Sequence, residues 1–64
     1  MIFKYTYKDK NDNTIASDNS TVFVSEADFR AYRRKEMKQM PNVHYCEYYE
    51  LGVRKARIKT IANF

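Results

Sequence analysis

The sequence is poor in the residue types from which disulfides, metal centres and phosphate-binding loops are built. Its 64 residues include one cysteine, one histidine and one glycine. A single cysteine excludes an internal disulfide and a cysteine-rich zinc site, and a single glycine excludes a glycine-rich phosphate loop. His44 and Cys46 lie two positions apart, but nothing else in the chain completes a metal site or a nucleophile–base pair around them. We interpret them as a surface histidine beside a half-buried cysteine, and expect no metal, no cofactor and no enzymatic activity.

Long apolar runs are also absent. Lys4 interrupts the apolar N-terminal stretch and Asp9 soon follows, so the pattern of a secretory signal peptide is missing. No window has the length of a transmembrane helix. Together with the single cysteine, these features predict a cytoplasmic protein without a membrane partner.

One short run imitates the opening of a calcium-binding loop. Asp9, Asn11 and Asn13 alternate as calcium ligands do, but the positions that need glycine and glutamate hold Thr14 and Ser20. Residues of these types also favour tight turns. We therefore interpret the run as an ordinary turn.

Hydrophobic and aromatic residues are plentiful enough for a folded core. They make up 44% and 16% of the chain, which predicts a single domain over residues 1–64 rather than disorder. Tyrosine supplies six of the aromatic residues. Because each tyrosine hydroxyl needs a partner, we expect several of them at the core edge or at an interface. The net charge of +4 allows an acidic protein or a nucleic acid as partner without requiring either.

The stretch from Val24 to Pro41 has the start and stop signals of a helix. Ser25 is a good N-cap, and Asp28 stands three residues later, where a capping box places its carboxylate. Pro41 cannot continue a helix and disfavours helical geometry in the residue before it. We predict one helix, Glu26–Gln39.

This helix has an apolar side and a basic side. Val24 and Phe29 occupy the positions of a hydrophobic staple. The apolar side consists of Phe29, Tyr32, Met37 and Met40, with Arg33 and Glu36 as irregularities in the same arc. The opposite side carries Arg30, Arg34 and Lys38, each four positions from the next. The basic side is either a solvated outer face or a ridge offered to an anionic partner.

Alternating apolar and polar residues predict strands on both sides of the helix. The predicted strands are Ile2–Tyr7, Thr14–Ser17, Val43–Leu51 and Arg54–Ile61, with Thr21–Val24 as a further extended segment. A helix is the competing interpretation of the last segment, but its apolar residues form no helical stripe. The predicted class is α+β in the order β-β-α-β-β: an antiparallel sheet of four short strands, or five if the further segment pairs, with one helix packed on one face.

A single helix leaves one face of such a sheet uncovered. We place Phe3, Tyr5 and Tyr7 on the helix side, together with the odd-numbered positions of Val43–Leu51, which are the more apolar ones although they include Glu47. The uncovered face is then expected to carry Lys4, Thr6, His44, Cys46, Tyr48, Lys55, Arg57 and Lys59.

Two functions fit this surface. The first is a non-enzymatic protein-binding module, a small regulator or inhibitor of a larger protein, because tyrosine and arginine are enriched at interface hot spots. Small accessory proteins of phages and mobile elements have this size and style, which is an analogy and not a family resemblance. The alternative is nucleic-acid binding by aromatic and basic side chains on the uncovered face, and a homodimer through that face is compatible with either. The candidate partner-binding residues are Arg30, Arg34, Lys38, Tyr48, Lys55, Arg57 and Lys59.

Overall fold

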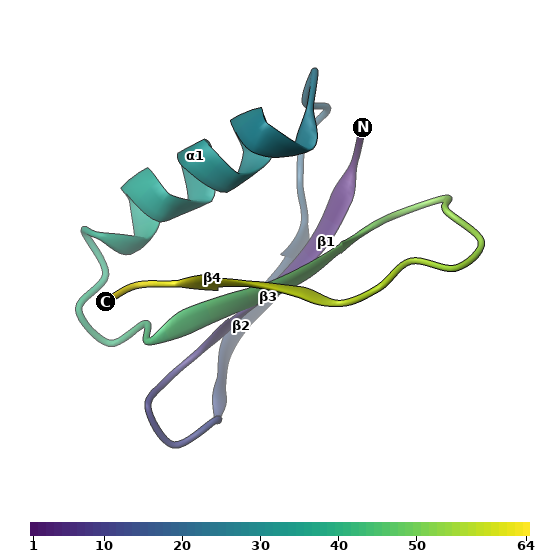
Figure 1. The fold of residues 1–64 in the computed structure, drawn as a ribbon. Helices are drawn as coiled ribbons and strands as arrows, with labels where there is room; N and C mark the ends of the chain where they lie inside the picture. The colour runs from purple at the N-terminus through teal and green to yellow at the C-terminus, as the bar shows by residue number, and fades with distance from the viewer.

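The protein consists of one sheet and one helix in a computed structural model that describes residues 1–64. The elements are β1 (Phe3–Lys8), β2 (Thr14–Asn19), α1 (Glu26–Met37), β3 (Tyr45–Glu50) and β4 (Lys59–Ala62). Neighbouring strands are antiparallel in the order β2-β1-β3-β4, and α1 lies on one face of the sheet (Figure 1). The predicted α+β class is confirmed. The further segment Thr21–Val24 is not a strand, so the sheet has four strands.

Helix α1 begins where its capping residues predict and ends two residues early. The Ser25 hydroxyl accepts a hydrogen bond from the Asp28 amide at 3.2 Å, as an N-cap serine does. The last helical residue is Met37 rather than Gln39, because the Met40 amide donates to the Met37 carbonyl in a tighter turn. At 12 residues, α1 is too short and too polar to cross a bilayer.

The core lies between α1 and the sheet, and Phe29 is its central ring. The Phe29 centroid lies 4.3 Å from that of Phe3 and 4.9 Å from that of Tyr48. Phe23 also packs against Phe29, at 5.4 Å, whereas Val24 is 91% exposed, so the predicted staple is wrong. The buried residues are Phe3, Tyr7, Phe29, Met37, Val43, Cys46, Tyr48 and Ile61.

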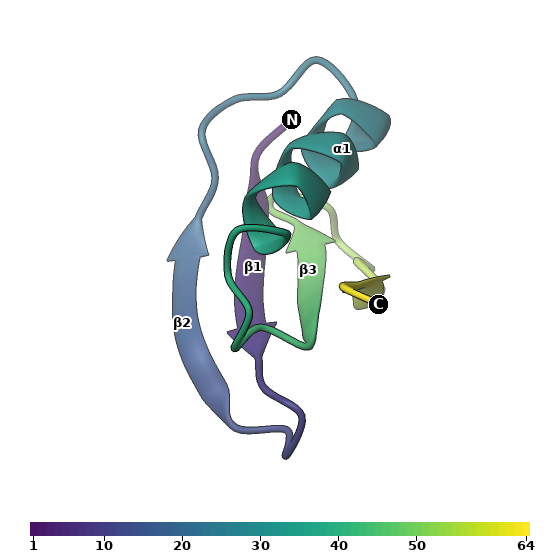
Figure 2. The same cartoon turned by 90° about the vertical axis from the view of Figure 1, so that its left-hand side faces the viewer.

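Strand β2 stands outside this core. All six of its residues are exposed, and Figure 2 shows α1 over the β1 and β3 side of the sheet with β2 to one side. β2 pairs with β1 and with no other strand. One edge of the sheet is therefore covered by nothing else in the chain.

Candidate interaction surfaces

The structure reverses the predicted facing of strand β3. Tyr48 lies opposite Tyr5, and Cys46 lies opposite Tyr7; residues directly opposite each other point to the same face of a sheet. Tyr48 is 1% exposed and Cys46 is fully buried, so both lie beneath α1 and their predicted place on the uncovered face is wrong. The prediction followed the larger number of apolar residues at odd-numbered positions. Glu47 shares that parity and is the signal against it, because a carboxylate is almost never buried without a partner.

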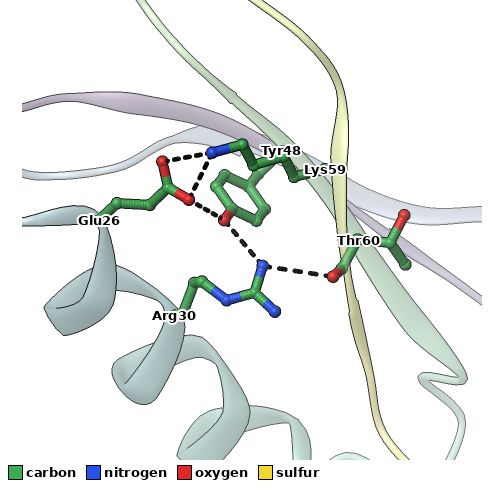
Figure 3. A network of polar contacts seen from close by, with 5 residues as sticks. All are labelled: Glu26, Arg30, Tyr48, Lys59 and Thr60. Atoms are coloured by element: carbon green, nitrogen blue, oxygen red, sulfur yellow. Dashed lines mark hydrogen bonds and ion pairs between the residues drawn. The ribbon is translucent and has the colours of Figure 1, made fainter.

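Tyr48 is the centre of a polar network that joins α1 to β3 and β4 (Figure 3). Its hydroxyl accepts from Arg30 Nη1 at 2.8 Å and donates to Glu26 Oε2 at 2.9 Å. Lys59 Nζ donates to both Glu26 carboxylate oxygens, at 2.9 and 2.8 Å. Arg30 Nη1 also donates to the Thr60 carbonyl at 3.3 Å. We call Glu26, Arg30, Tyr48 and Lys59 the helix clasp, because they hold the first half of the helix on the sheet.

The neutral Tyr48 hydroxyl allows the helix clasp to join a cation to an anion. Burial is the main reason that the pKa of Tyr48 is raised, and the hydrogen bond from Arg30 opposes this rise. A neutral hydroxyl accepts and donates at once, so it satisfies Arg30 and Glu26 together. Arg30 and Lys59 were predicted to bind a partner, but both are paired within the molecule, with Tyr48 and Glu26 respectively.

Through the Glu26 carboxylate, the helix clasp should contribute to the free energy of unfolding in a way that is lost at acid pH. Hydrogen bonds from Lys59 and then from Tyr48 lower the pKa of Glu26. A carboxyl group with a lowered folded-state pKa stabilises the fold above its unfolded pKa, and this contribution is lost as the pH falls through the folded value. Between about pH 5 and about pH 3, we expect the urea midpoint of the wild type to fall more steeply than that of Glu26→Gln, with the two curves converging at the acid end.

The difference between the wild type and Glu26→Gln reports on Glu26 alone. Backbone amides lower the pKa of Asp9 in the same direction, but Asp9 is present in both proteins and cancels in the difference. The Glu26–Lys59 pair is partly exposed, so the difference should be small. Parallel curves over the whole range would contradict the assignment.

The predicted basic ridge on α1 keeps two of its three members. Arg34 and Lys38 are exposed, as predicted. Arg30 is half-buried, because its long side chain extends past the helix edge to the Tyr48 hydroxyl and the Thr60 carbonyl. The ridge of three free cations is therefore wrong at Arg30.

Arg33 also turns toward the sheet. Its Nη1 donates to the Tyr7 hydroxyl at 2.9 Å, and its guanidinium carbon lies 4.5 Å from the ring centroids of Tyr5 and Tyr32. The arginine that looked like an irregularity in the apolar arc is thus the partner of a buried tyrosine. Burial raises the pKa of Tyr7, and the charge and hydrogen bond of Arg33 oppose that rise.

Lys55 and Arg57 lie in a loop rather than on a strand. The β3–β4 pairing extends only to Tyr48 opposite Lys59, so the residues between β3 and β4 form the connection. Arg54, Lys55 and Arg57 are exposed there, and no ion pair engages them. We call these three residues the loop cations. The prediction that Lys55, Arg57 and Lys59 share the uncovered face is wrong, because Lys55 and Arg57 lie in the loop and Lys59 lies opposite Tyr48 in the helix clasp.

The uncovered side of the sheet carries a different pair of tyrosines. Tyr49 is 37% exposed near the end of the sheet where the Leu51 amide donates to the Ile2 carbonyl at 2.8 Å. The Tyr45 hydroxyl donates to Asp12 Oδ1 at 2.9 Å, and this bond is the main reason that the pKa of Tyr45 is raised to about 12. The sequence missed both tyrosines as surface residues because it placed them in the core. We call this side the open face; its side chains include Lys4, Thr6, Lys8, Ser17, Asn19, Tyr45, Glu47, Tyr49 and Thr60.

The residues considered for metal or nucleophile chemistry do not come together. His44 is exposed, whereas Cys46 is buried and its burial raises the pKa of the thiol to about 11. The Asp9 carboxylate accepts from the Asn11 and Asn13 amides at 2.8 and 2.9 Å, in the predicted turn. No group of three histidine, cysteine, aspartate or glutamate side chains is placed to hold a metal ion.

Three surfaces thus remain as candidates for contact: the open face, the loop cations and the exposed edge of β2. No protein-family model matches the sequence, and no match is found among curated proteins or solved structures.

Proposed function

We propose that this protein is a non-enzymatic binding module, a small regulator or inhibitor that docks through its open face on a larger protein in the cytoplasm. The observation that carries the proposal is the uncovered side of the four-stranded sheet, where Tyr49 and Tyr45 lie opposite Lys4 and Lys8. A solvated sheet face is common in antiparallel sheets. The composition of this one favours an interface, because tyrosine is among the side chains that contribute most to binding at protein interfaces.

The open face has an apolar end and a polar centre. Ile2 and Tyr49 are exposed at the apolar end, next to Leu51. In the centre, Glu47 lies opposite Thr6. A complementary partner would place an apolar patch against Ile2 and Tyr49 and carboxylates near the flanking lysines, since opposite charges across an interface fix its orientation.

A double variant of the open face tests this proposal. Lys4→Glu with Tyr49→Ala removes an aromatic contact and reverses a charge on neighbouring strands. A partner captured from an extract of the source organism by the immobilised wild type should bind the purified double variant at least about 30-fold more weakly, since loss of one hot spot costs at least about 2 kcal/mol.

The matched control is Arg34→Glu, which reverses an exposed charge on α1, the element that covers the other face of the sheet (Figure 1). It should keep wild-type affinity for the same partner, and circular dichroism should show that all three proteins are folded. Equal loss in the control and the double variant, or wild-type binding by the double variant, would remove the open face from the proposal.

The loop cations favour nucleic-acid binding as a second candidate function. Arg54, Lys55 and Arg57 fall within four positions and have no acidic neighbour in that stretch. Contacts to about three phosphates would give a slope near −3 in a plot of log affinity against log salt concentration. Replacing all three with alanine should abolish that slope, whereas absence of oligonucleotide binding by the wild type at low salt would reject this candidate.

A further inference from the structure

The two edge strands of the sheet, β4 and β2, differ in how the rest of the chain contacts them. At the β4 edge, the Thr60 carbonyl accepts from Arg30 of the helix. At the β2 edge, all six residues are exposed and no helix or loop covers them (Figure 2). Edge strands are commonly protected by lysine, proline or a bulge. β2 contains neither lysine nor proline, and its one register shift lies near its first end, at Ile15. Asp18 is its one charged residue.

The pairing between β1 and β2 shows which backbone groups are unpaired. The Ser20 amide donates to the Phe3 carbonyl at 2.7 Å. Backbone groups alternate along an antiparallel strand between one neighbour and the other. The groups of Asp18 and Ala16 therefore point toward β1, and those of Ser17 and its alternate neighbours point outward. The outward set over the regular part of β2 is Ser17 and Asn19. Ile15 is the extra residue where the β1–β2 register shifts, so the alternation does not extend to it.

We propose that two copies of this chain associate through their β2 edges, antiparallel and related by a two-fold axis at Ser17. In this register Ser17 pairs with Ser17 of the second copy, and Asn19 lies across from the bulge at Ile15. The outward amide and carbonyl of Ser17 then face the carbonyl and amide of Ser17 in the second copy, as a self-complementary two-fold interface requires. Asp18 lies opposite Ala16, so no like charges meet.

Charge also favours a second copy at this edge. The net charge of +4 makes two copies repel in general, but β2 itself carries one negative charge and no positive one. The loop cations lie in the connection between β3 and β4, toward the edge of the sheet opposite to β2. Pairing at β2 therefore joins the copies through strands of low charge, where the nearest cation is the Lys8 ammonium that donates to the Thr14 hydroxyl at 2.9 Å.

The arrangement differs from the homodimer considered from the sequence. Two sheets joined edge to edge about an axis normal to the sheet form one sheet of eight strands with both helices on the same side. The open faces become continuous and stay available to a partner. Dimerisation through the open face would instead bury Tyr49 and Lys4.

One side chain competes with this pairing. Asp18 Oδ1 accepts from the outward amide of Asn19 at 2.7 Å. The carboxylate must release that amide when the second copy's carbonyl takes its place. Asp18→Ala should therefore tighten the dimer on the order of tenfold, since each copy frees one amide hydrogen bond.

Disulfide cross-linking tests the register. In the proposed dimer the two Ser17 Cα atoms are about 5.5 Å apart, within the range that a disulfide spans. Ser17→Cys should form a cross-linked dimer under mild oxidation. Cys46 can remain in place, because it is fully buried and does not compete.

The matched control is Asn19→Cys, on the same strand and the same face. Its two copies would lie on the order of 14 Å apart along the strands, so it should cross-link at least tenfold more slowly. Sedimentation should show the wild type approaching the dimer mass as concentration rises. A monomer at every concentration with no Ser17→Cys cross-linking would overturn the proposal, and equal cross-linking of the two variants would overturn the register.

Discussion

Replacement of Phe29 by alanine should remove most of the stability of this domain. Phe29 is fully buried and packs against Phe3, Tyr48 and Phe23. Truncating a buried phenylalanine to alanine costs about 3–5 kcal/mol, because burial is lost and a cavity remains. A chain of 64 residues has a total stability of roughly 3–10 kcal/mol. We therefore expect the variant to be largely unfolded at 37 °C, as measured by urea or thermal denaturation followed by circular dichroism.

Val24→Ala is the control for this prediction. Val24 is apolar and lies two residues before the helix, but it is 91% exposed, so its truncation should change the free energy of unfolding by less than about 0.5 kcal/mol. If the two variants had similar stability, α1 would not be held to the sheet by Phe29. The contrast also tests the correction to the predicted hydrophobic staple.

The secondary structure could be predicted because its signals are local. The Ser25 cap and the alternation of Phe3, Tyr5 and Tyr7 each lie within a few residues of the element they specify. The facing of β3 is not local in this sense. It depends on the placing of Tyr48 opposite Tyr5, a pairing across more than forty positions of sequence.

The last strand shows a second limit of local patterns. Residues from Arg54 onward alternate as a strand does, but a strand needs a neighbour at the correct register. The β3–β4 pairing extends only to Tyr48 and Lys59, which leaves Lys55 and Arg57 in the connection. Alternation alone cannot separate an extended loop from a paired strand.

The candidate site was predicted less well than the fold because long basic side chains have two uses. Arg30 and Arg33 lie on a helix where charge suggests an exposed surface, yet their stems reach over the core and their heads satisfy the buried hydroxyls of Tyr48 and Tyr7. The number of tyrosines was the available signal, since each buried hydroxyl needs a partner. Which arginine serves which tyrosine follows only from the packed structure.

Arg33→Ala should be the most destabilising change of a charged residue. The variant would leave the hydroxyl of Tyr7, which is 5% exposed, without its hydrogen bond at a cost of about 1–3 kcal/mol. It would also remove the guanidinium from the rings of Tyr5 and Tyr32, contacts worth about 0.5–1 kcal/mol each at partly exposed sites. Urea denaturation should show a loss of about 2–5 kcal/mol, against less than about 0.5 kcal/mol for the exposed Arg34→Ala.

A double-mutant cycle with Tyr7→Phe separates the hydrogen bond from the stacking. If the cost of Arg33→Ala includes an unsatisfied Tyr7 hydroxyl, removing that hydroxyl should restore part of the stability, so the double variant should be more stable than the sum of the single changes predicts. The stacking on Tyr5 and Tyr32 is lost in both backgrounds and should not be restored. Strict additivity of the two changes would mean that the Tyr7 hydroxyl finds water when Arg33 is absent, and would reduce the role of Arg33 to its contacts with the rings.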